Sequence, residues 1–348
     1  MVSNSDELRK TALFRPRRTS SKVWKNETAD FPSLGKPRDT PCVQPARRAK
    51  MRAVNAPLPS ATDWPLRLFK LSLLKQEKLR AISDLLGNTA GMTCLDIGGD
   101  NGVISLLLRQ RGGTWTSADG GARAVESIRQ LVGERVVQVE GCRLPLPDGC
   151  FDRVVVVDYI EHVIEDEAFI AECHRVLKPD GVLIVNTPHI KPSLLFGFRR
   201  MLGLSDKRHG HVRPGYTEAQ LFAVLKDGFD VEQARTYSWF FTQLLDTGIR
   251  WISERKNANH DAVKGTLLTG ADFQRLEKSL KLYRIVFPFF WLAVQLDRLL
   301  FFTRGFMLIV RAHRRPWLKR NSAPSLQNGR SLAEAALGGR IGSAAKLG

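Results

Sequence analysis

The sequence predicts an α/β fold in which a doubly wound, mostly parallel sheet of seven strands carries helices on both faces. Three observations lead to this prediction. Apolar runs alternate with helical segments without a break from residue 92 to residue 187, which is typical of parallel sheets. The run Val154 to Val157 is β-branched throughout, as suits a strand buried on both faces. Glycines at 98, 99 and 102 follow the first apolar run and let the backbone turn sharply.

The elements follow from periodicity and from turn residues. A helical stripe from Leu66 to Leu86 ends at Gly87 and is expected to cover the sheet. Strands are expected at Met92–Ile97, Thr114–Ala118, Val136–Val139, Val154–Val157, Val182–Asn186 and Phe229–Tyr237. Helices are expected at Val103–Arg111, Ala122–Leu131, Asp166–Leu177 and Thr217–Leu225, and a turn at Lys178–Gly181.

The positive charge of the chain is concentrated at its ends. The 348 residues carry a formal net charge of +18, of which residues 1–60 contribute +8 and residues 311–348 contribute +7. Only +3 remains for residues 61–310. Both ends could contact a polyanion such as nucleic acid or an anionic membrane. We interpret residues 1–60 and 314–348 as disordered basic tails, because they hold few large apolar residues.

Cysteine usage and the N-terminal residues favour a reducing compartment. The five cysteines form no CxxC pair and no Cys/His ligand spacing, which argues against a disulfide scaffold and against a metal site. An apolar signal-peptide core does not follow Met1, so secretion is not indicated. We therefore expect a cytoplasmic protein.

The first strand, the glycine turn and the next helix together predict a nucleotide-sized pocket at the carboxyl end of the sheet. Asp119 ends the second expected strand, 23 residues beyond Asp96. An acid in that place can accept hydrogen bonds from both ribose hydroxyls of an adenosine. The alternative is that Asp119 only caps the helix Ala122–Leu131.

Five stretches, in this order and at these spacings, resemble the class I S-adenosylmethionine-dependent methyltransferases. They are LDIGGDNG, Asp119, LPLPDGCFD, DYIEHV and HRVLKPDGVLIV, and the resemblance covers about residues 75–235. It implies S-adenosyl-L-methionine as the cofactor, and that Asp96, Gly98 and Gly102 shape the loop around its methionine part. It further implies that Asp119 holds the ribose, that Glu140 lies near the adenine amino group, and that Asp158 lines the methionine end.

The chain departs from the family pattern at two positions. Asp100 replaces the middle glycine of Gly-x-Gly-x-Gly, where its side chain could narrow the pocket or approach the cationic sulfonium. Glu140 replaces the usual Asp, which is a milder change. A nicotinamide cofactor is disfavoured, because GxGxxG does not read through Gly98 to Gly102.

Methyl transfer to a hydroxyl requires alignment, exclusion of water and a base. Three histidines follow the fifth strand: His189, His209 and His211. By likeness to family members with a His before a Tyr-Thr helix start, we favour His211 as the general base, with His189 as the alternative. In the competing interpretation, His211 only fixes the loop ahead of Thr217. For His162 we expect a structural role, orienting its loop together with Glu161.

Residues 238–305 form an unusually apolar segment between the sixth strand and an expected last strand at Phe306–Ala312, which in such folds runs antiparallel to its neighbours. The uncharged run Ile285–Leu296 is 12 residues long, too short for the roughly 20 residues that cross a bilayer. Two interpretations remain: a helical lid on the core, or an element that presents aromatic residues to a membrane interface beside basic residues. Those basic residues are Lys278, Lys281, Arg284, Arg298 and Arg304.

The domain plan is therefore a tail (1–60), a cofactor-binding core (61–237), an apolar helical insertion (238–305), the last core strand (306–313) and a second tail (314–348). We expect O-methylation of a small-molecule, lipid or lipid-linked acceptor, peripherally on the inner face of the membrane. A nucleic-acid acceptor is disfavoured, because the fourth strand leads into Asp158-Tyr159-Ile160-Glu161 rather than Asn/Asp-Pro-Pro-Tyr and the centre is nearly neutral. It remains an alternative, as does an inactive scaffold. The sequence leaves the oligomeric state open.

Overall fold

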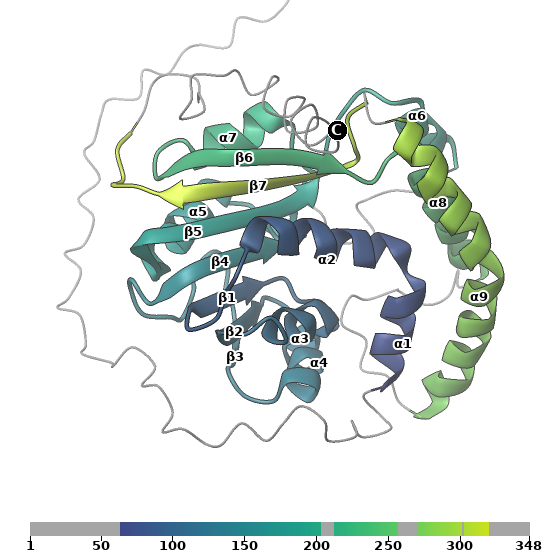
Figure 1. The fold of residues 1–348 in the computed structure, drawn as a ribbon, viewed down its shortest axis with the longest axis horizontal. Coiled ribbons are helices and arrows are strands. Elements are labelled where there is room, and N and C mark those ends of the chain that lie inside the picture. Colours follow the sequence, from purple (N-terminus) through teal and green to yellow (C-terminus); the bar gives the residue numbers. More distant parts are fainter. Residues whose placement is uncertain (1–62, 203–211, 257–269, 301–302, 320–348) are drawn as a thin grey trace, which may run out of the picture. The chain divides into compact units, whose positions relative to one another are not determined.

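The computed structural model describes residues 63–202, 212–256, 270–300 and 303–319 (Figure 1). Both expected tails lie almost wholly outside these ranges, apart from residues 314–319. The helices are α1 (Asp63–Leu71), α2 (Leu73–Leu86), α3 (Val103–Arg109), α4 (Ala122–Val132), α5 (Asp166–Val176), α6 (Leu194–Met201), α7 (Glu218–Leu225), α8 (Phe240–Lys256) and α9 (Gly270–Leu299), with the 3-10 helix η1 (Ile160–His162). The strands are β1 (Thr93–Ile97), β2 (Thr114–Asp119), β3 (Val136–Gln138), β4 (Phe151–Val157), β5 (Leu177–Pro188), β6 (Phe229–Tyr237) and β7 (Met307–Arg314).

The seven strands form one sheet in the order β3-β2-β1-β4-β5-β7-β6. Neighbouring strands from β3 to β5 run parallel. β7 inserts between β5 and β6 and is antiparallel to both, pairing Asn186 with Ile309 on one side and Ala234 with Val310 on the other. This order confirms the predicted fold class, including the antiparallel last strand.

Helices cover both faces of the sheet, and each face has its own apolar core. On one face Val154 and Val156 pack with Phe169 of α5 and Phe222 of α7, among other residues. On the other face Val155 packs with side chains of α2 and α3, and Figure 1 shows α2 lying across the strands. Burying an apolar side chain of this size contributes about 1.5–3 kcal/mol. The β-branched side chains of β4 thus alternate between the two apolar cores, one on each face of the sheet.

Two predicted elements differ from the structure. The helix expected over Leu66–Leu86 is two helices, α1 and α2, because Ser72 leaves helical geometry and its side chain accepts a hydrogen bond from the backbone N–H of Lys75. The turn expected at Lys178–Gly181 lies inside β5: Leu177 pairs with Phe151 while Val182 pairs with Arg153, so the extra residues form an irregularity in a longer strand.

The capping residue of α7 is confirmed. The Thr217 side chain accepts from the N–H of Gln220, and the Gln220 side chain accepts from the N–H of Thr217. α6 was not predicted; it follows β5 and ends before the residues that the structure leaves out.

Between β6 and β7 the described residues form α8 and α9, which lie side by side in Figure 1. The carboxylate of Asp297, near the end of α9, is 2% exposed and accepts from the N–H groups of Phe241 (2.8 Å) and Thr242 (3.0 Å) at the start of α8. The chain leaves and rejoins the sheet at adjacent points, since Phe306 N donates to Ser238 O at 2.8 Å. In the described part of the chain, every helix is too short or too polar to cross a membrane.

Candidate active site

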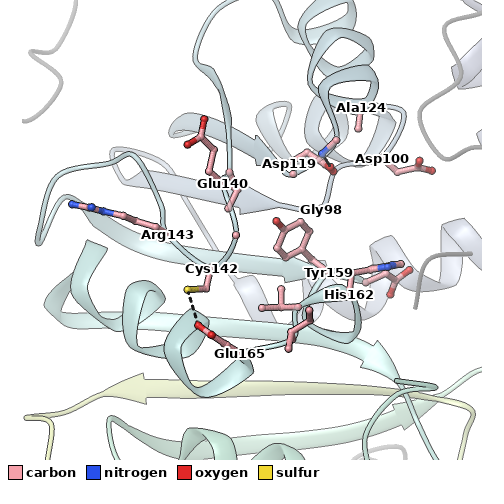
Figure 2. A pocket seen from close by; sticks show the side chains of 17 residues that line it. Gly98, Asp100, Asp119, Ala124, Glu140, Cys142, Arg143, Tyr159, His162 and Glu165 are labelled. Carbon is pink, nitrogen blue, oxygen red and sulfur yellow. Dashed lines mark hydrogen bonds between the residues drawn. The ribbon is translucent and has the colours of Figure 1, made fainter. Parts of the chain in front are cut away.

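A pocket of about 730 Å³ opens at the carboxyl ends of β1, β2 and β4 (Figure 2). All of its described lining residues lie between Gly98 and Glu165. Four residues predicted to bind the cofactor are among them, namely Gly98, Asp119, Glu140 and Asp158. A cavity of 300–1,000 Å³ is about the size that proteins use for small molecules and cofactors. Described residues of α8 and α9 do not line this pocket.

The glycine turn brings backbone to the pocket where a side chain would not fit. Gly98 has φ +88°, and a Cβ there would lie 2.2 Å from the carbonyl oxygen of Val157. Gly102, at φ +81°, is not on the pocket; a Cβ there would lie 2.8 Å from Cα of Ile128 in α4. Gly98 therefore shapes the cavity, and Gly102 allows the turn to pack on the next helix.

Asp96 lies beneath the turn rather than on the pocket. It is 1% exposed, and its carboxylate accepts hydrogen bonds from Ser117 Oγ (2.8 Å), Ser105 Oγ and Arg109 Nη1 (3.4 Å). Burial raises the pKa of this carboxyl, against the opposing effect of Arg109 and the two hydroxyls. Its described contacts support the loop from below, so a cofactor contact would have to come from the backbone around it.

Asp119 lies where both predicted alternatives require it, and its contact with a ribose stays a prediction. One carboxylate oxygen accepts from Gly121 N at 3.0 Å, at the entrance to α4, and the same residue lines the pocket. Tyr159 follows β4 nearby, and a Cβ on Gly120 would lie 2.8 Å from its hydroxyl oxygen. Burial, together with the charge of Asp119, raises the pKa of Tyr159 to about 12. The Tyr159 hydroxyl therefore remains protonated beside the acid at neutral pH.

Asp158 is held at the end of β4 by a chain of polar groups. Its carboxylate accepts from Asn186 Nδ2 at 2.7 Å and forms an ion pair with Lys78 of α2. The Tyr237 hydroxyl donates to Asn186 Oδ1 at 2.6 Å. Burial lowers the pKa of Lys78, but the charge and hydrogen bond of Asp158 outweigh this effect and raise it overall. A protonated lysine therefore accompanies this end of the pocket.

Sequence reasoning missed Lys78, because α2 was expected only to cover the sheet. The available signal was the pair Lys75 and Lys78, which share one helix face at a spacing of three residues. Burial lowers the pKa of Lys75, an effect that the charge of Asp100 opposes. Asp100 lines the pocket with φ +50°, a left-handed conformation in the place where the family usually has glycine.

The predicted bases are placed very differently. His211 and His209 lie outside the described residues. His189 is 3% exposed and is not on the pocket. Its Nδ1–H donates to Gly305 O at 2.8 Å, and its Nε2 lies 3.3 Å from Glu218 Oε2, which also pairs with Arg304. His189 therefore joins the end of β5 to the segment before β7.

His162 lines the pocket (Figure 2), whereas its neighbour Glu161 turns into the core. Glu161 is fully buried and accepts from Thr187 Oγ1 at 3.3 Å. The two residues, which we expected to act together on the loop, thus face different surroundings. Both residues lie in the 3-10 helix η1, in which successive side chains point in different directions, and adjacent positions in a sequence motif do not reveal such a helix.

Comparison with known proteins agrees with this geometry. Residues 95–185 match a family described as a methyltransferase domain. A ubiquinone biosynthesis O-methyltransferase from Pseudomonas paraeruginosa is 34% identical over 110 residues, covering 30% of this chain and 47% of that protein. Its counterpart from Pseudomonas syringae pv. tomato is 33% identical over 116 residues, covering 31% and 50%. The chain therefore spans about half the length of the curated relatives it matches.

Among solved structures, a SAM dependent methyltransferase from Aquifex aeolicus has a TM-score of 0.39 and 21% identity, covering 50% of this chain and 92% of that one. The matched range 95–185 holds the glycine turn and all four predicted residues that line the pocket. Residues 95–185, which form the centre of the sheet, are therefore similar in sequence to methyltransferase domains.

Proposed function

We propose that this protein transfers the methyl group of S-adenosylmethionine to a hydroxyl of a small or lipid-like acceptor. The observation that carries the proposal is the pocket itself, in which Gly98, Asp119, Glu140 and Asp158 meet at one edge of the sheet. The names of the curated relatives, which are O-methyltransferases, support oxygen as the atom methylated.

The pocket residues fit the cofactor. Asp119 lines the pocket at the end of β2, and its carboxylate has lone pairs enough to accept from ribose hydroxyls as well as from Gly121 N. Asp158 would face the methionine ammonium, and Lys78 the methionine carboxylate, with Asn186 fixing the Asp158 side chain. Gly98 leaves room for close approach of the backbone. The bound cofactor supplies an electrophilic methyl group on a sulfonium, so the protein has to provide alignment, exclusion of water and a base.

We assign the base to a histidine. A neutral imidazole has its unperturbed pKa near neutrality and can take the hydroxyl proton as the oxygen attacks. His162 is the histidine that lines the described pocket. His211, which the family resemblance favours, is the competing candidate, and the residue after it is anchored beside this site because Val212 N donates to Glu161 O at 3.1 Å.

Calorimetry of the full chain with S-adenosylmethionine and with S-adenosylhomocysteine tests the proposal. We expect one site per chain and binding that is lost in an Asp119→Ala, Asp158→Ala double variant. An inactive scaffold would bind neither compound. A methylase of nucleic acid would instead place the methyl group on RNA or DNA and bind it with a steep salt dependence.

The finer part of the proposal concerns the membrane. α9 carries an exposed apolar ridge, which we define as Ile285, Phe289, Leu292 and Leu299. These positions recur at helical spacing and share one face. Phe289 is 60% exposed and Leu292 is 51% exposed. The opposite face packs inward through Phe290, Ala293 and the Asp297 carboxylate.

The inward face of α8 is polar. Thr242, Gln243 and Thr247 are buried, and Arg199 of α6 donates to Thr247 Oγ1 at 2.8 Å and to Gln243 Oε1 at 2.7 Å. Helices that bury polar groups and expose large apolar ones suit an interface with lipid. We propose that the ridge rests on the cytoplasmic face of a membrane and that the acceptor is a lipid or a lipid-linked compound.

Flotation with vesicles tests the membrane contact. The full chain is mixed with phosphatidylcholine vesicles, with and without an anionic lipid, and is expected to float with both and more completely with the second. The variant Phe289→Glu, Leu292→Glu should lose most of the flotation. Leu318→Glu, which changes another exposed leucine, is the matched control. A chain that does not float, but forms dimers that the ridge variant dissociates in light scattering, would contradict the membrane proposal.

A further inference from the structure

One wall of the pocket is a short segment between regular elements. Val163, Ile164 and Glu165 line the cavity and lie between η1 and α5. Glu165 is the N-cap position of α5, yet its side chain does not cap the helix. The Glu165 carbonyl accepts from Phe169 N of α5. The Val163 and Ile164 carbonyls precede the helix and take their hydrogen-bond partners from elsewhere in the chain.

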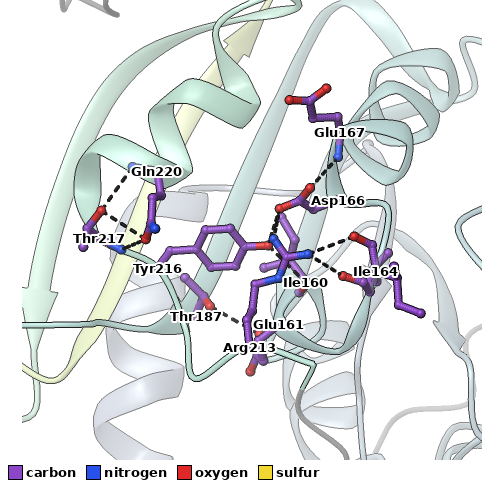
Figure 3. Close-up of polar contacts among 11 residues, drawn as sticks. Ile160, Glu161, Ile164, Asp166, Glu167, Thr187, Arg213, Tyr216, Thr217 and Gln220 are labelled. Atoms are coloured by element: carbon purple, nitrogen blue, oxygen red, sulfur yellow. Dashed lines mark hydrogen bonds and ion pairs between the residues drawn. The ribbon is translucent and has the colours of Figure 1, made fainter. Parts of the chain in front are cut away.

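Arg213 provides those partners (Figure 3). Its Nη2 donates to Val163 O at 3.1 Å and to Ile164 O at 2.9 Å, and its Nη1 forms an ion pair with Asp166. The backbone N–H of Arg213 donates to Glu161 O at 3.3 Å. One guanidinium thus joins two adjacent carbonyls of the wall to the first residue of α5.

The segment that carries Arg213 is itself fixed to the sheet. Tyr216 N donates to Pro188 O at 2.9 Å, and the Tyr216 hydroxyl donates to Asp166 Oδ2 at 2.8 Å. A Cβ on Gly215 would lie 2.3 Å from Pro188 O, so the chain passes close to the end of β5. Asp166 therefore receives both Arg213 and Tyr216, and the wall is tied to β5 through them.

We propose that Arg213 is a positioning residue that holds the Val163–Glu165 wall of the pocket in the geometry needed to bind the adenosyl cofactor. The inference rests on the proposed function of the pocket. Arginine suits this task because its planar fork reaches two carbonyls and a carboxylate at once, whereas a lysine ammonium acts as a single point charge. Without the Arg213 guanidinium, the Val163–Glu165 wall loses the hydrogen bonds that fix the carbonyls of Val163 and Ile164.

The test measures the Kd of S-adenosylhomocysteine by calorimetry, well below the unfolding temperature, for the full-length wild type and for Arg213→Gln, Arg213→Lys and Tyr216→Phe. We expect Kd to rise about tenfold for Arg213→Gln and by a smaller factor for Arg213→Lys, with one site per chain retained. Tyr216→Phe removes only the hydroxyl and should raise Kd least.

Arg311→Gln is the matched control. Arg311 also bonds to a carboxylate and to a backbone carbonyl, those of Glu232 (2.6 Å) and Leu85, but neither partner lines the pocket. The Arg311→Gln variant should lower the Tm and leave the Kd of S-adenosylhomocysteine unchanged. Partial unfolding in any variant would reduce the number of sites per chain rather than raise Kd.

The inference would be overturned if Arg213→Gln lowers the Tm as much as the control does but binds S-adenosylhomocysteine with a Kd within twofold of the wild-type value. That result would leave the proposed function standing. If Arg213→Gln does not fold, the Kd values of Arg213→Lys and Tyr216→Phe are compared with that of the wild type instead, and values within twofold would overturn the inference. A wild-type chain that does not bind S-adenosylhomocysteine would remove the proposed function, and the inference with it.

Discussion

The sheet core and the α8–α9 pair are built in opposite ways. In the core, apolar side chains such as Val154 and Ile184 are fully buried. In the helical pair, the buried positions include Thr242, Thr247 and Asp297, while large apolar side chains of α9 face outward. The core is stabilised by burial of apolar area, whereas the pair is joined by hydrogen bonds to buried groups.

Exposed apolar side chains on the described part of α9 support the proposal that this face contacts a partner, because large exposed apolar patches mark interaction sites. In the core, by contrast, polar side chains such as Asp119 and Asp158 lie at the strand ends, where the pocket opens. The following predictions, from the largest expected effect to the smallest, test whether the two regions have separate tasks.

The largest effect is expected from replacing the proposed general base, His162. His162→Asn should lower methyl transfer to a panel of prenylated phenols by about 100-fold or more, the usual contribution of a positioned base. The Kd of S-adenosylhomocysteine should change little. Radiolabelled methyl incorporation measures the rate, and His211→Asn is the paired variant. If only His211→Asn slows transfer, His162 is not the base.

Asp119 should matter for affinity. Under the proposed function, Asp119→Ala removes the acceptors for two ribose hydroxyls. Because hydrogen bonds to charged groups contribute about 1.5–3 kcal/mol each, the Kd of S-adenosylhomocysteine should rise more than tenfold. Asp119→Asn keeps an oxygen that can accept from Gly121 N at the start of α4. Comparison of the Asn and Ala variants therefore separates the effect on this helix from the effect on ribose binding. Equal affinity of the Ala variant and the wild type in calorimetry would remove the ribose assignment.

The helical pair should depend on Asp297. Asp297→Asn removes the charge from a buried group that accepts from Phe241 N and Thr242 N. We expect a loss of about 1–3 kcal/mol in unfolding free energy, with cofactor Kd unchanged. Denaturant titration measures the loss, and the exposed Asp180→Asn is the control. A parallel loss of cofactor affinity would show that the two regions are not separate.

The smallest effect is a pH dependence at Lys191. Burial lowers the pKa of Lys191 to about 8, although Asp297 opposes this effect. The folded-state pKa is below the unfolded value, so unfolding takes up a proton between about pH 8 and 10.5 and this group favours the folded state increasingly as pH rises through that window. The stability of wild type relative to Lys191→Met should therefore rise there. A flat difference in denaturant titrations would contradict the shift.

The sheet could be predicted from the sequence because its signals are local. The β-branched run of β4, the glycine turn and the Thr217 cap each specify their own element. The early start of β5 could not, because Leu177 joins the strand through pairing with the distant Phe151. The split at Ser72 rests on a local cap, the hydrogen bond from Lys75 N to Ser72 Oγ, and was overlooked because the apolar stripe continues across it.

Residues that line the pocket were predicted where a strand end fixes a side chain, as for Asp119 and Asp158. The ion-pair partner of Asp158, Lys78, was missed because a distant helix supplies it. The different surroundings of Glu161 and His162 were missed because both lie in one short 3-10 helix. The buried role of Asp297 could not be predicted, because its partners at the start of α8 lie 55 and 56 residues earlier in the sequence.

The hydrogen bond between Ser238 and Phe306 makes the α8–α9 segment separable in principle. Tyr237 and Met307 are already cross-strand partners, so β6 and β7 are in register for a hairpin. Replacing residues 239–303 with a short loop would therefore keep the strand register and the contacts of His189 with Gly305 and of Glu218 with Arg304. The sheet and the α8–α9 segment could therefore be acquired, exchanged or lost as independent modules.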